Sequence, residues 1–255
     1  MSVFGRYSQY YDLLYRDKDY PGETAFIASL LGRHAPQAKS LCELGCGTGL
    51  HAALLAERGY GVHGVDFSDT MLEAARARAG ALPPAIGGKL SFSGGDVCNM
   101  TLDARFDAVL SLFHVVSYQT GNDSLLEMFA NAAAHLKPGG IFVFDYWYGP
   151  AVLSQRPATR VKRMESDAIA VTRLAESELH INESVVDVNY HIFIRDKANG
   201  AVEEVRETHS MRYLFASDID FLARSAGFTV RESREWMTDA TPGDETWGVY
   251  SVLSR

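Results

Sequence analysis

The sequence has little cysteine and no excess of positive charge. Its three cysteines are an odd number without the spacing of a disulfide framework, which favours a reducing compartment, the cytoplasm. A formal net charge of -8 argues against a broad nucleic-acid surface, because such a surface needs clustered lysine and arginine. No apolar run is long enough to cross a bilayer, and no signal peptide is recognisable. We therefore expect a small-molecule partner rather than a nucleic acid or a membrane.

Two common nucleotide-binding fingerprints are also missing. Residues 40–49 read Ser-Leu-Cys-Glu-Leu-Gly-Cys-Gly-Thr-Gly, with glycines at alternate positions. A dinucleotide fingerprint needs a third glycine three residues after the second, and counting from Gly45 or Gly47 places Leu50 or Ala52 there instead. No Gly-x-x-x-x-Gly-Lys-Ser/Thr run occurs, so the phosphate-binding loop of nucleoside triphosphatases is excluded as well.

What is present is a short apolar strand that runs into a glycine turn. Glycine adopts positive φ and has no side chain, so a ligand can lie against the bare backbone of such a turn. A second apolar strand, residues 61–66, ends in Asp66 after a stretch long enough for a helix and a return to the adjacent parallel strand. A carboxylate at that point can accept hydrogen bonds from both hydroxyls of a ribose. The two features together predict a nucleoside-bearing cofactor.

Further motifs follow the glycine turn in a recognisable order, namely Asp66-Phe-Ser-Asp-Thr-Met-Leu72, Leu90-Ser-Phe-Ser-Gly-Gly-Asp-Val97, and His135-Leu-Lys-Pro-Gly-Gly140. This set resembles the motifs of class I S-adenosylmethionine (SAM) methyltransferases, with Glu43 in the usual acidic position before the first glycine. The resemblance implies SAM as the cofactor, with Asp66 on the ribose and Asp96 on the adenine amino group. The residues that we assign to cofactor binding are Tyr20, Glu43, Gly45, Gly47, Gly49, Asp66, Phe67, Met71, Asp96, Val97 and Leu112.

The expected fold is α/β, a Rossmann-like SAM-methyltransferase sheet with helices on both faces. At 255 residues the chain suits a single domain over 1–255, with an N-terminal helical cap over 1–36. Alternation between about 150 and 215 predicts an antiparallel insertion of three strands after strand five. Because the cofactor of this fold lies over the carboxyl ends of the parallel strands, we expect the insertion to cover the active site.

A narrower resemblance covers nearly the whole chain. The aromatic segment Tyr10–Tyr20 looks like the opening of bacterial N-methyltransferases that act on nucleotide-linked aminosugars, and Asp145–Tyr148 and Arg206–His209 are similar to two further stretches. The resemblance implies an aminosugar nucleotide as acceptor, although Tyr146 and Tyr118 replace the family's Pro and His and leave the sugar open. Candidate substrate-binding residues are Tyr7, Tyr11, Tyr15 and Trp147, and candidate catalytic residues are Tyr118 and His209.

The chemistry leaves alternatives open. A sulfonium methyl group is already activated and a neutral amine is a competent nucleophile, so positioning can supply most of the catalysis and a base need only take a proton. An alcohol demands more, usually a His–acid pair or a metal, and no metal-ligand spacing is recognisable. We therefore expect a metal-free N-methyltransferase, with a small-molecule O-methyltransferase or a non-catalytic SAM-binding module as alternatives. We expect a monomer or a homodimer.

A basic stretch remains without an assignment from these motifs. Such a group of side chains can clamp a nucleotide diphosphate, because guanidinium forks match phosphate oxygens. A solvated strand face balanced by nearby acids is the other interpretation. The residues concerned are Arg156, Arg160, Lys162, Arg163 and Arg173.

Overall fold

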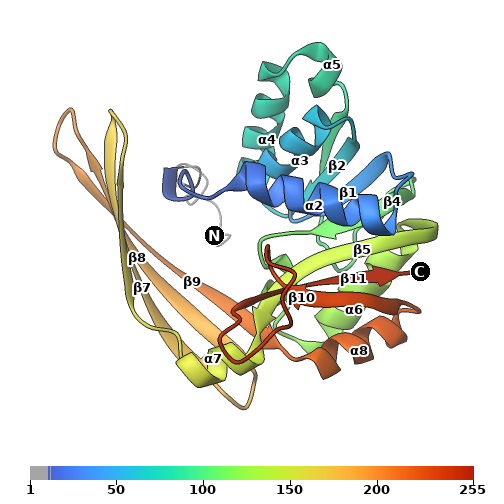
Figure 1. Cartoon of the computed structure of the whole chain (residues 1–255). Coiled ribbons are helices and arrows are strands. Elements are labelled where there is room, and N and C mark those ends of the chain that lie inside the picture. The colour runs from blue at the N-terminus through green and yellow to red at the C-terminus, as the bar shows by residue number, and fades with distance from the viewer. Residues whose placement is uncertain (1–10, 12) are drawn as a thin grey trace.

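A mixed sheet forms the centre of the computed structural model, which describes residue 11 and residues 13–255 (Figure 1). The core strands lie in the order β3–β2–β1–β4–β5–β11–β10, with β11 antiparallel to β5 and β10. Their bounds are β1 Ser40–Leu44, β2 Gly61–Asp66, β3 Leu90–Gly94, β4 Phe106–Ser111, β5 Leu136–Tyr148, β10 Thr229–Glu235 and β11 Gly248–Ser254. The helices are α2 Tyr20–His34, α3 Leu50–Glu57, α4 Asp69–Ala81, α5 Pro84–Gly87, α6 Asn122–Ala134, α7 Gly149–Gln155, α8 Ala216–Ser225 and the 3-10 helix η1 Val115–Tyr118.

Helices cover both faces of the core sheet, as expected from the sequence. Along β5, Ile141 and Val143 pack with side chains of α2 and α3, whereas Phe142 and Phe144 pack with α6 and α8 on the other face. Successive strand residues point to opposite faces, so a strand covered on both sides is apolar at every position. The continuous apolar runs of the sequence follow from this double coverage.

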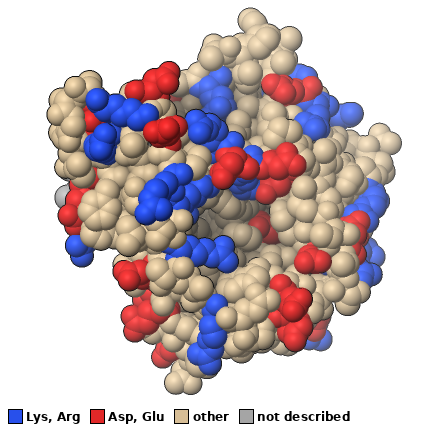
Figure 2. All heavy atoms as spheres, turned by 60° about the vertical axis from the view of Figure 1, so that its left-hand side comes forward, with Lys and Arg blue, Asp and Glu red and all other residues tan. Residues whose placement is uncertain are grey.

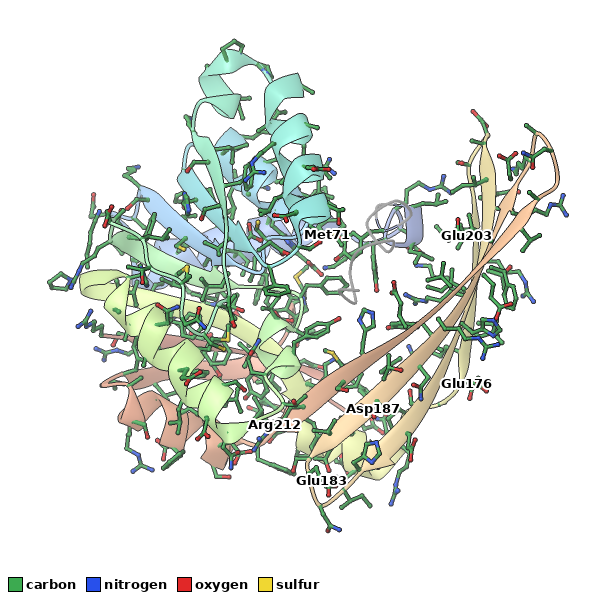
Figure 3. The ribbon with its side chains drawn as sticks, turned by 180° about the vertical axis from the view of Figure 1, so that it is seen from behind. Met71, Glu176, Glu183, Asp187, Glu203 and Arg212 are labelled. Atoms are coloured by element: carbon green, nitrogen blue, oxygen red, sulfur yellow. The ribbon has the colours of Figure 1, made fainter. Side chains whose placement is uncertain are left out.

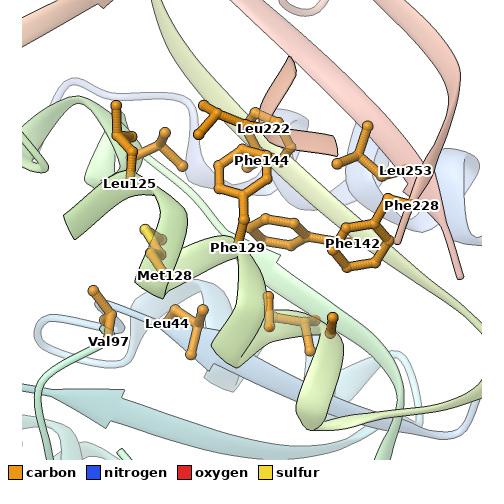
Figure 4. Packing of buried hydrophobic residues seen from close by; sticks show 14 of the residues in the cluster. Leu44, Val97, Leu125, Met128, Phe129, Phe142, Phe144, Leu222, Phe228 and Leu253 are labelled. Atoms are coloured by element: carbon orange, nitrogen blue, oxygen red, sulfur yellow. The ribbon is translucent and has the colours of Figure 1, made fainter. Parts of the chain in front are cut away.

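Aromatic rings fill the space between the sheet and α6 (Figure 4). Phe129 of α6 meets Phe142 and Phe144 of β5 edge-on, with ring centroids 5.4 and 5.2 Å apart. Leu222 of α8 and Phe228 belong to the same buried cluster. Large aromatic side chains favour such edge-to-face packing. The cluster therefore fixes the position of β5 in the sheet, and with it the position of the residues at the carboxyl end of this strand.

The insertion after β5 has four antiparallel strands, so the expectation of three strands was wrong. The strands are β6 Arg160–Glu165, β7 Ile169–His180, β8 Val185–Asp196 and β9 Val202–Leu214. The turn between β6 and β7, residues 166–168, contains neither glycine nor proline, which are the residues that usually mark a turn in a sequence. At its base, β9 pairs with Trp147 and Tyr148 of β5 and so joins the insertion to the core.

The long strands of the insertion extend away from the core sheet (Figure 1). On their inner face Val171, Ile192 and Val205 belong to one buried cluster with Met71 of α4. Figure 3 shows this arrangement from behind, with Arg212 near the base of the insertion, Glu203 near its tip and Met71 on the core side. This apolar cluster, which includes Leu14 of the N-terminal segment, thus connects the insertion with the core.

Candidate active site

A cavity of about 630 Å³ lies at the carboxyl ends of the parallel strands. Its wall on the core side comes from the turn after β1, the ends of β2 and β5, and the segments after β3 and β4. On the other side it is bounded by Arg160, Tyr190 and Met211 of the insertion. Figure 2 shows a hollow on this face of the molecule, with Lys and Arg side chains beside it. Ligands of open α/β sheets bind at this position.

The glycine turn lies in the left-handed region of backbone conformation. Gly45, Gly47 and Gly49 have φ of 71°, 54° and 71°, which residues with a Cβ adopt at a cost. A Cβ on Gly45 would lie 2.6 Å from Val115 Cγ2. A Cβ on Gly49 would lie 3.0 Å from the Cβ of Ala75, and Gly49 does not line the cavity. Gly49 thus permits close packing within the core, whereas Gly45 and Gly47 face the cavity.

Two carboxylates stand where a nucleoside can be held. Asp66, at the end of β2, accepts the backbone N–H of Gly47 at 2.8 Å and that of Ser68 at 2.9 Å. Burial raises the pKa of Asp66, and these backbone N–H groups offset part of the increase. Asp96, after β3, accepts the N–H of Cys98 at 2.9 Å. Each carboxylate keeps acceptor capacity beyond these bonds, since an ionised carboxylate offers about four lone-pair sites.

Glu43 carries a polar atom that the described residues leave unsatisfied. It is buried in β1 beside the glycine turn, lines the cavity, and its Oε2 has no hydrogen-bond partner among the described residues. Burial, followed by the nearby charge of Asp66, raises the pKa of Glu43 to about 8. A cationic ligand group would satisfy this oxygen and return the carboxyl to its ionised form. The ammonium group of the methionine part of SAM meets that requirement.

An aromatic wall closes the cavity on the side of the N-terminal segment. The rings of Tyr11 and Tyr15 are 4.7 Å apart, and the ring of Tyr15 meets that of Phe113 edge-on at 5.0 Å. Tyr20, the first residue of α2, packs against His51 with centroids 4.9 Å apart. Aromatic faces attract cations such as a sulfonium, and they also cover the apolar faces of ligands. Tyr7 lies outside the described residues.

The two residues expected to be catalytic lie next to each other. The hydroxyl of Tyr118 and Nδ1 of His209 are 2.8 Å apart, and His209 Nε2 lies 3.4 Å from Glu207. Tyr118 lines the cavity, whereas His209 is buried behind it and does not. Burial raises the pKa of Tyr118 well above its usual value, so the phenol stays protonated at neutral pH. This pair can orient a substrate group through the Tyr118 hydroxyl.

A second His–acid pair was not assigned from the sequence. His114 Nδ1 lies 2.7 Å from Asp145 Oδ2, and the backbone N–H of His114 donates to the same carboxylate at 3.1 and 3.2 Å. Asp145 is buried in β5, and His114 lines the cavity. The two residues are 31 positions apart in the chain. Only the parallel pairing of β4 with β5 brings them together, so sequence spacing carried no signal of the pair.

The cavity gathers most of the residues predicted for cofactor or substrate. Gly49 and His209 are the described exceptions, as stated above. Within the basic stretch, Arg160 lines the cavity and its side chain makes no hydrogen bond or ion pair with a described residue, whereas Lys162 is paired with Asp17 at 2.7 Å. The predicted residues that line the cavity are Tyr11, Tyr15, Tyr20, Glu43, Gly45, Gly47, Asp66, Phe67, Met71, Asp96, Val97, Leu112, Tyr118 and Trp147.

Comparisons with known proteins agree with this geometry. Residues 41–140 match the family described as a methyltransferase domain. The chain is 31% identical over 224 residues to dTDP-3-amino-3,4,6-trideoxy-alpha-D-glucopyranose N,N-dimethyltransferase of Streptomyces venezuelae, which covers 86% of this chain and 89% of that protein. It is 28% identical over 228 residues to dTDP-3-amino-3,6-dideoxy-alpha-D-glucopyranose N,N-dimethyltransferase of Streptomyces fradiae, with 89% and 85% covered. The solved structure of Streptomyces venezuelae DesVI superposes with a TM-score of 0.79 at 26% identity over 97% of both chains.

The fold and the cavity define a class I SAM-dependent methyltransferase. At the level of similarity found, the chain belongs to the family of the dTDP-aminosugar N,N-dimethyltransferases. Among the helices of the described residues, none has the length and apolar character needed to span a membrane. Across residues 11 and 13–255, no group of three or more His, Cys, Asp and Glu side chains is arranged to hold a metal ion.

Proposed function

We propose that this enzyme transfers the methyl group of SAM to the amine of a nucleotide-linked aminosugar. The observation that carries the proposal is the two-sided cavity. Its core side offers the glycine turn, Glu43 and Asp66 to a nucleoside with an ammonium group, and its insertion side offers Tyr190 and Arg160 to a second molecule. The family's named substrates, dTDP-linked aminosugars, combine an anionic nucleotide with an amine.

The residues on the core side would hold the cofactor. Glu43 would bind the ammonium group, Asp66 the ribose hydroxyls and Asp96 the adenine amino group, with Phe67 at the edge of the cavity. Phe67 is 71% exposed and borders the cavity, so a bound nucleoside would cover part of its ring. When bound, SAM supplies an activated methyl group, so the protein does not need to activate the electrophile.

The insertion would cover the site and recognise the acceptor. Arg160 points from β6 into the cavity without an acidic partner among the described residues, and a guanidinium of this kind suits phosphate oxygens. Tyr15, Trp147 and Tyr190 also line the cavity and would pack on the sugar. The chain's part in the reaction is then to orient the amine, exclude water and remove one proton.

The test is a panel assay with methyl-labelled SAM. The purified protein is incubated with dTDP-linked 3- and 4-aminosugars, their hydroxyl analogues and free amines, and methyl addition is followed by mass spectrometry. One or two methyl groups on an aminosugar nucleotide, with none on the hydroxyl analogue, would support the proposal. Binding of SAM without transfer to any acceptor would leave a SAM-binding module and overturn it.

One observation favours a second candidate function, O-methylation of a sugar hydroxyl. An alcohol must be partly deprotonated before it attacks, and a histidine beside a buried carboxylate is the usual device for this. His114 and Asp145 form such a pair at the cavity. The hydroxyl analogues in the panel decide between the two functions, because label on them alone would establish the O-methyltransferase.

A further inference from the structure

Two successive residues with side chains adopt a left-handed backbone at the end of β4. Phe113 and His114 have φ of 64° and 63°. Each such residue costs about 1–2 kcal/mol, and strain of this kind persists where surrounding contacts impose it, most often at functional sites. Here the turn brings both the backbone N–H and the imidazole of His114 onto the carboxylate of Asp145. The strained backbone conformation is therefore the one that places His114 against Asp145.

Asp145 provides a buried negative charge beside the imidazole. It is 1% exposed, and its backbone pairs with Tyr250 of β11, so its position is determined by the sheet. A buried carboxylate is costly unless it is paired. The 2.7 Å contact with His114 Nδ1 is not aligned as a hydrogen bond, so it acts mainly through charge. The Asp145 carboxylate is thus fixed next to Nδ1 of the imidazole.

The rest of the His114 ring faces open space. Its side chain is 25% exposed although Nδ1 is buried, so the exposed edge carries Nε2. His114 also borders a second cavity of about 370 Å³, where the charged groups are Asp17, Lys18, Glu23, Asp145 and Lys162. Four of these are already paired, Lys18 with Glu23 and Lys162 with Asp17. The His114 imidazole therefore contacts Asp145 through Nδ1, and its Nε2 is accessible to a ligand.

The pair formed by Tyr118 and His209 is less suited to proton removal. Its histidine is 3% exposed and lies outside the cavity lining, with Nδ1 engaged by Tyr118. The phenol between it and the cavity stays protonated at neutral pH because burial raises its pKa. Tyr118 can donate a hydrogen bond to a substrate, but a proton acceptor has to lie elsewhere.

We propose that the imidazole of His114, positioned by Asp145, accepts the proton that the acceptor's ammonium group must lose before methyl transfer. This inference rests on the proposed function. One N–H bond of the ammonium breaks, its electron pair stays on nitrogen, and the proton goes to Nε2 of His114. The nitrogen pair then forms the new N–C bond while the S–C bond breaks with its pair on sulfur. The imidazolium returns the proton to water through its exposed edge.

The variant His114→Gly tests the role without backbone strain, because glycine adopts the φ of 63° readily and its backbone N–H can still donate to Asp145. We expect SAM affinity within about 2-fold of wild type and a fall in kcat of about 100-fold or more, the range of a general base. Free imidazole should restore part of kcat, since the deleted ring leaves room for it. The deficit should shrink as pH rises, because more of the acceptor is then deprotonated in solution.

Two further variants separate this role from a structural one. Asp145→Asn removes the charge beside the ring and should lower kcat with little change in KM. His191→Gln removes a half-buried histidine on the outer side of the insertion, paired with Glu204, and should change neither kcat nor the response to imidazole. If the wild-type enzyme is active and His114→Gly has the same kcat, the inference about His114 is overturned while the proposed function stands. A wild-type enzyme inactive on the whole acceptor panel overturns the proposed function and this inference with it.

Discussion

Replacing Glu43 by glutamine should stabilise the free enzyme and weaken its binding of SAM. The residue is buried, its Oε2 is unsatisfied within the described part of the chain, and burial raises its pKa from 4.5 to about 8. The folded state therefore holds a proton that the unfolded state releases above pH 4.5. The resulting stability is fully present below pH 4.5 and is lost as pH rises towards 8.

The magnitude follows from the size of the shift. One pKa unit corresponds to about 1.4 kcal/mol, so wild type should lose ~3 kcal/mol of unfolding free energy between pH 4.5 and pH 7 through this group. Because glutamine does not ionise, the unfolding free energy of Glu43→Gln should not fall with pH through this position. SAM affinity should move the other way, because losing a charge-assisted hydrogen bond to the ammonium costs ~1.5–3 kcal/mol, or about 10- to 100-fold in Kd.

Denaturant unfolding at pH 5, 6, 7 and 8 measures the first effect, and titration calorimetry with SAM measures the second. The difference in unfolding free energy between Glu43→Gln and wild type should grow with pH. Glu57→Gln, an exposed carboxylate at the end of α3, is the matched control and should change neither quantity. A stability difference that stays constant from pH 5 to pH 8, or an undiminished affinity for SAM, would refute the reasoning.

Three other substitutions probe the remaining parts of the site. Asp66→Asn should lower SAM affinity about 10-fold in calorimetry, since an amide accepts fewer ribose hydrogen bonds, and unchanged affinity would place the ribose elsewhere. Arg160→Ala should raise KM for a nucleotide-linked acceptor about 10-fold with kcat spared, and Arg163→Ala, on the other face of β6, should leave KM unchanged. Gly45→Ala should lower Tm further than Gly47→Ala, because both have positive φ but only the added Cβ at Gly45 meets a side chain, at 2.6 Å. Equal Tm values for the two alanine variants would contradict that account.

Several features of the site were readable from the sequence because they are local. The glycine turn needs positive φ at positions 45 and 47. The motif that contains Asp66 indicates that a second strand ends beside this turn. The same reasoning misjudged the insertion, whose first turn has no glycine or proline to mark it. It also assigned Gly49 to the cofactor; in the structure this glycine does not line the cavity, and a Cβ there would lie 3.0 Å from the Cβ of Ala75.

By itself the sequence indicated the class of fold, the cofactor, and the edge of the sheet at which we propose that the cofactor binds. These depend on hydrophobic pattern and on residues close together in the chain, where backbone geometry leaves few choices. Only the tertiary structure decided which distant side chains meet. His114 reaches Asp145 because β4 and β5 pair in parallel, and Tyr118 reaches His209 because β9 pairs with the end of β5. Such contacts depend on strand register and long-range packing, which no local pattern encodes.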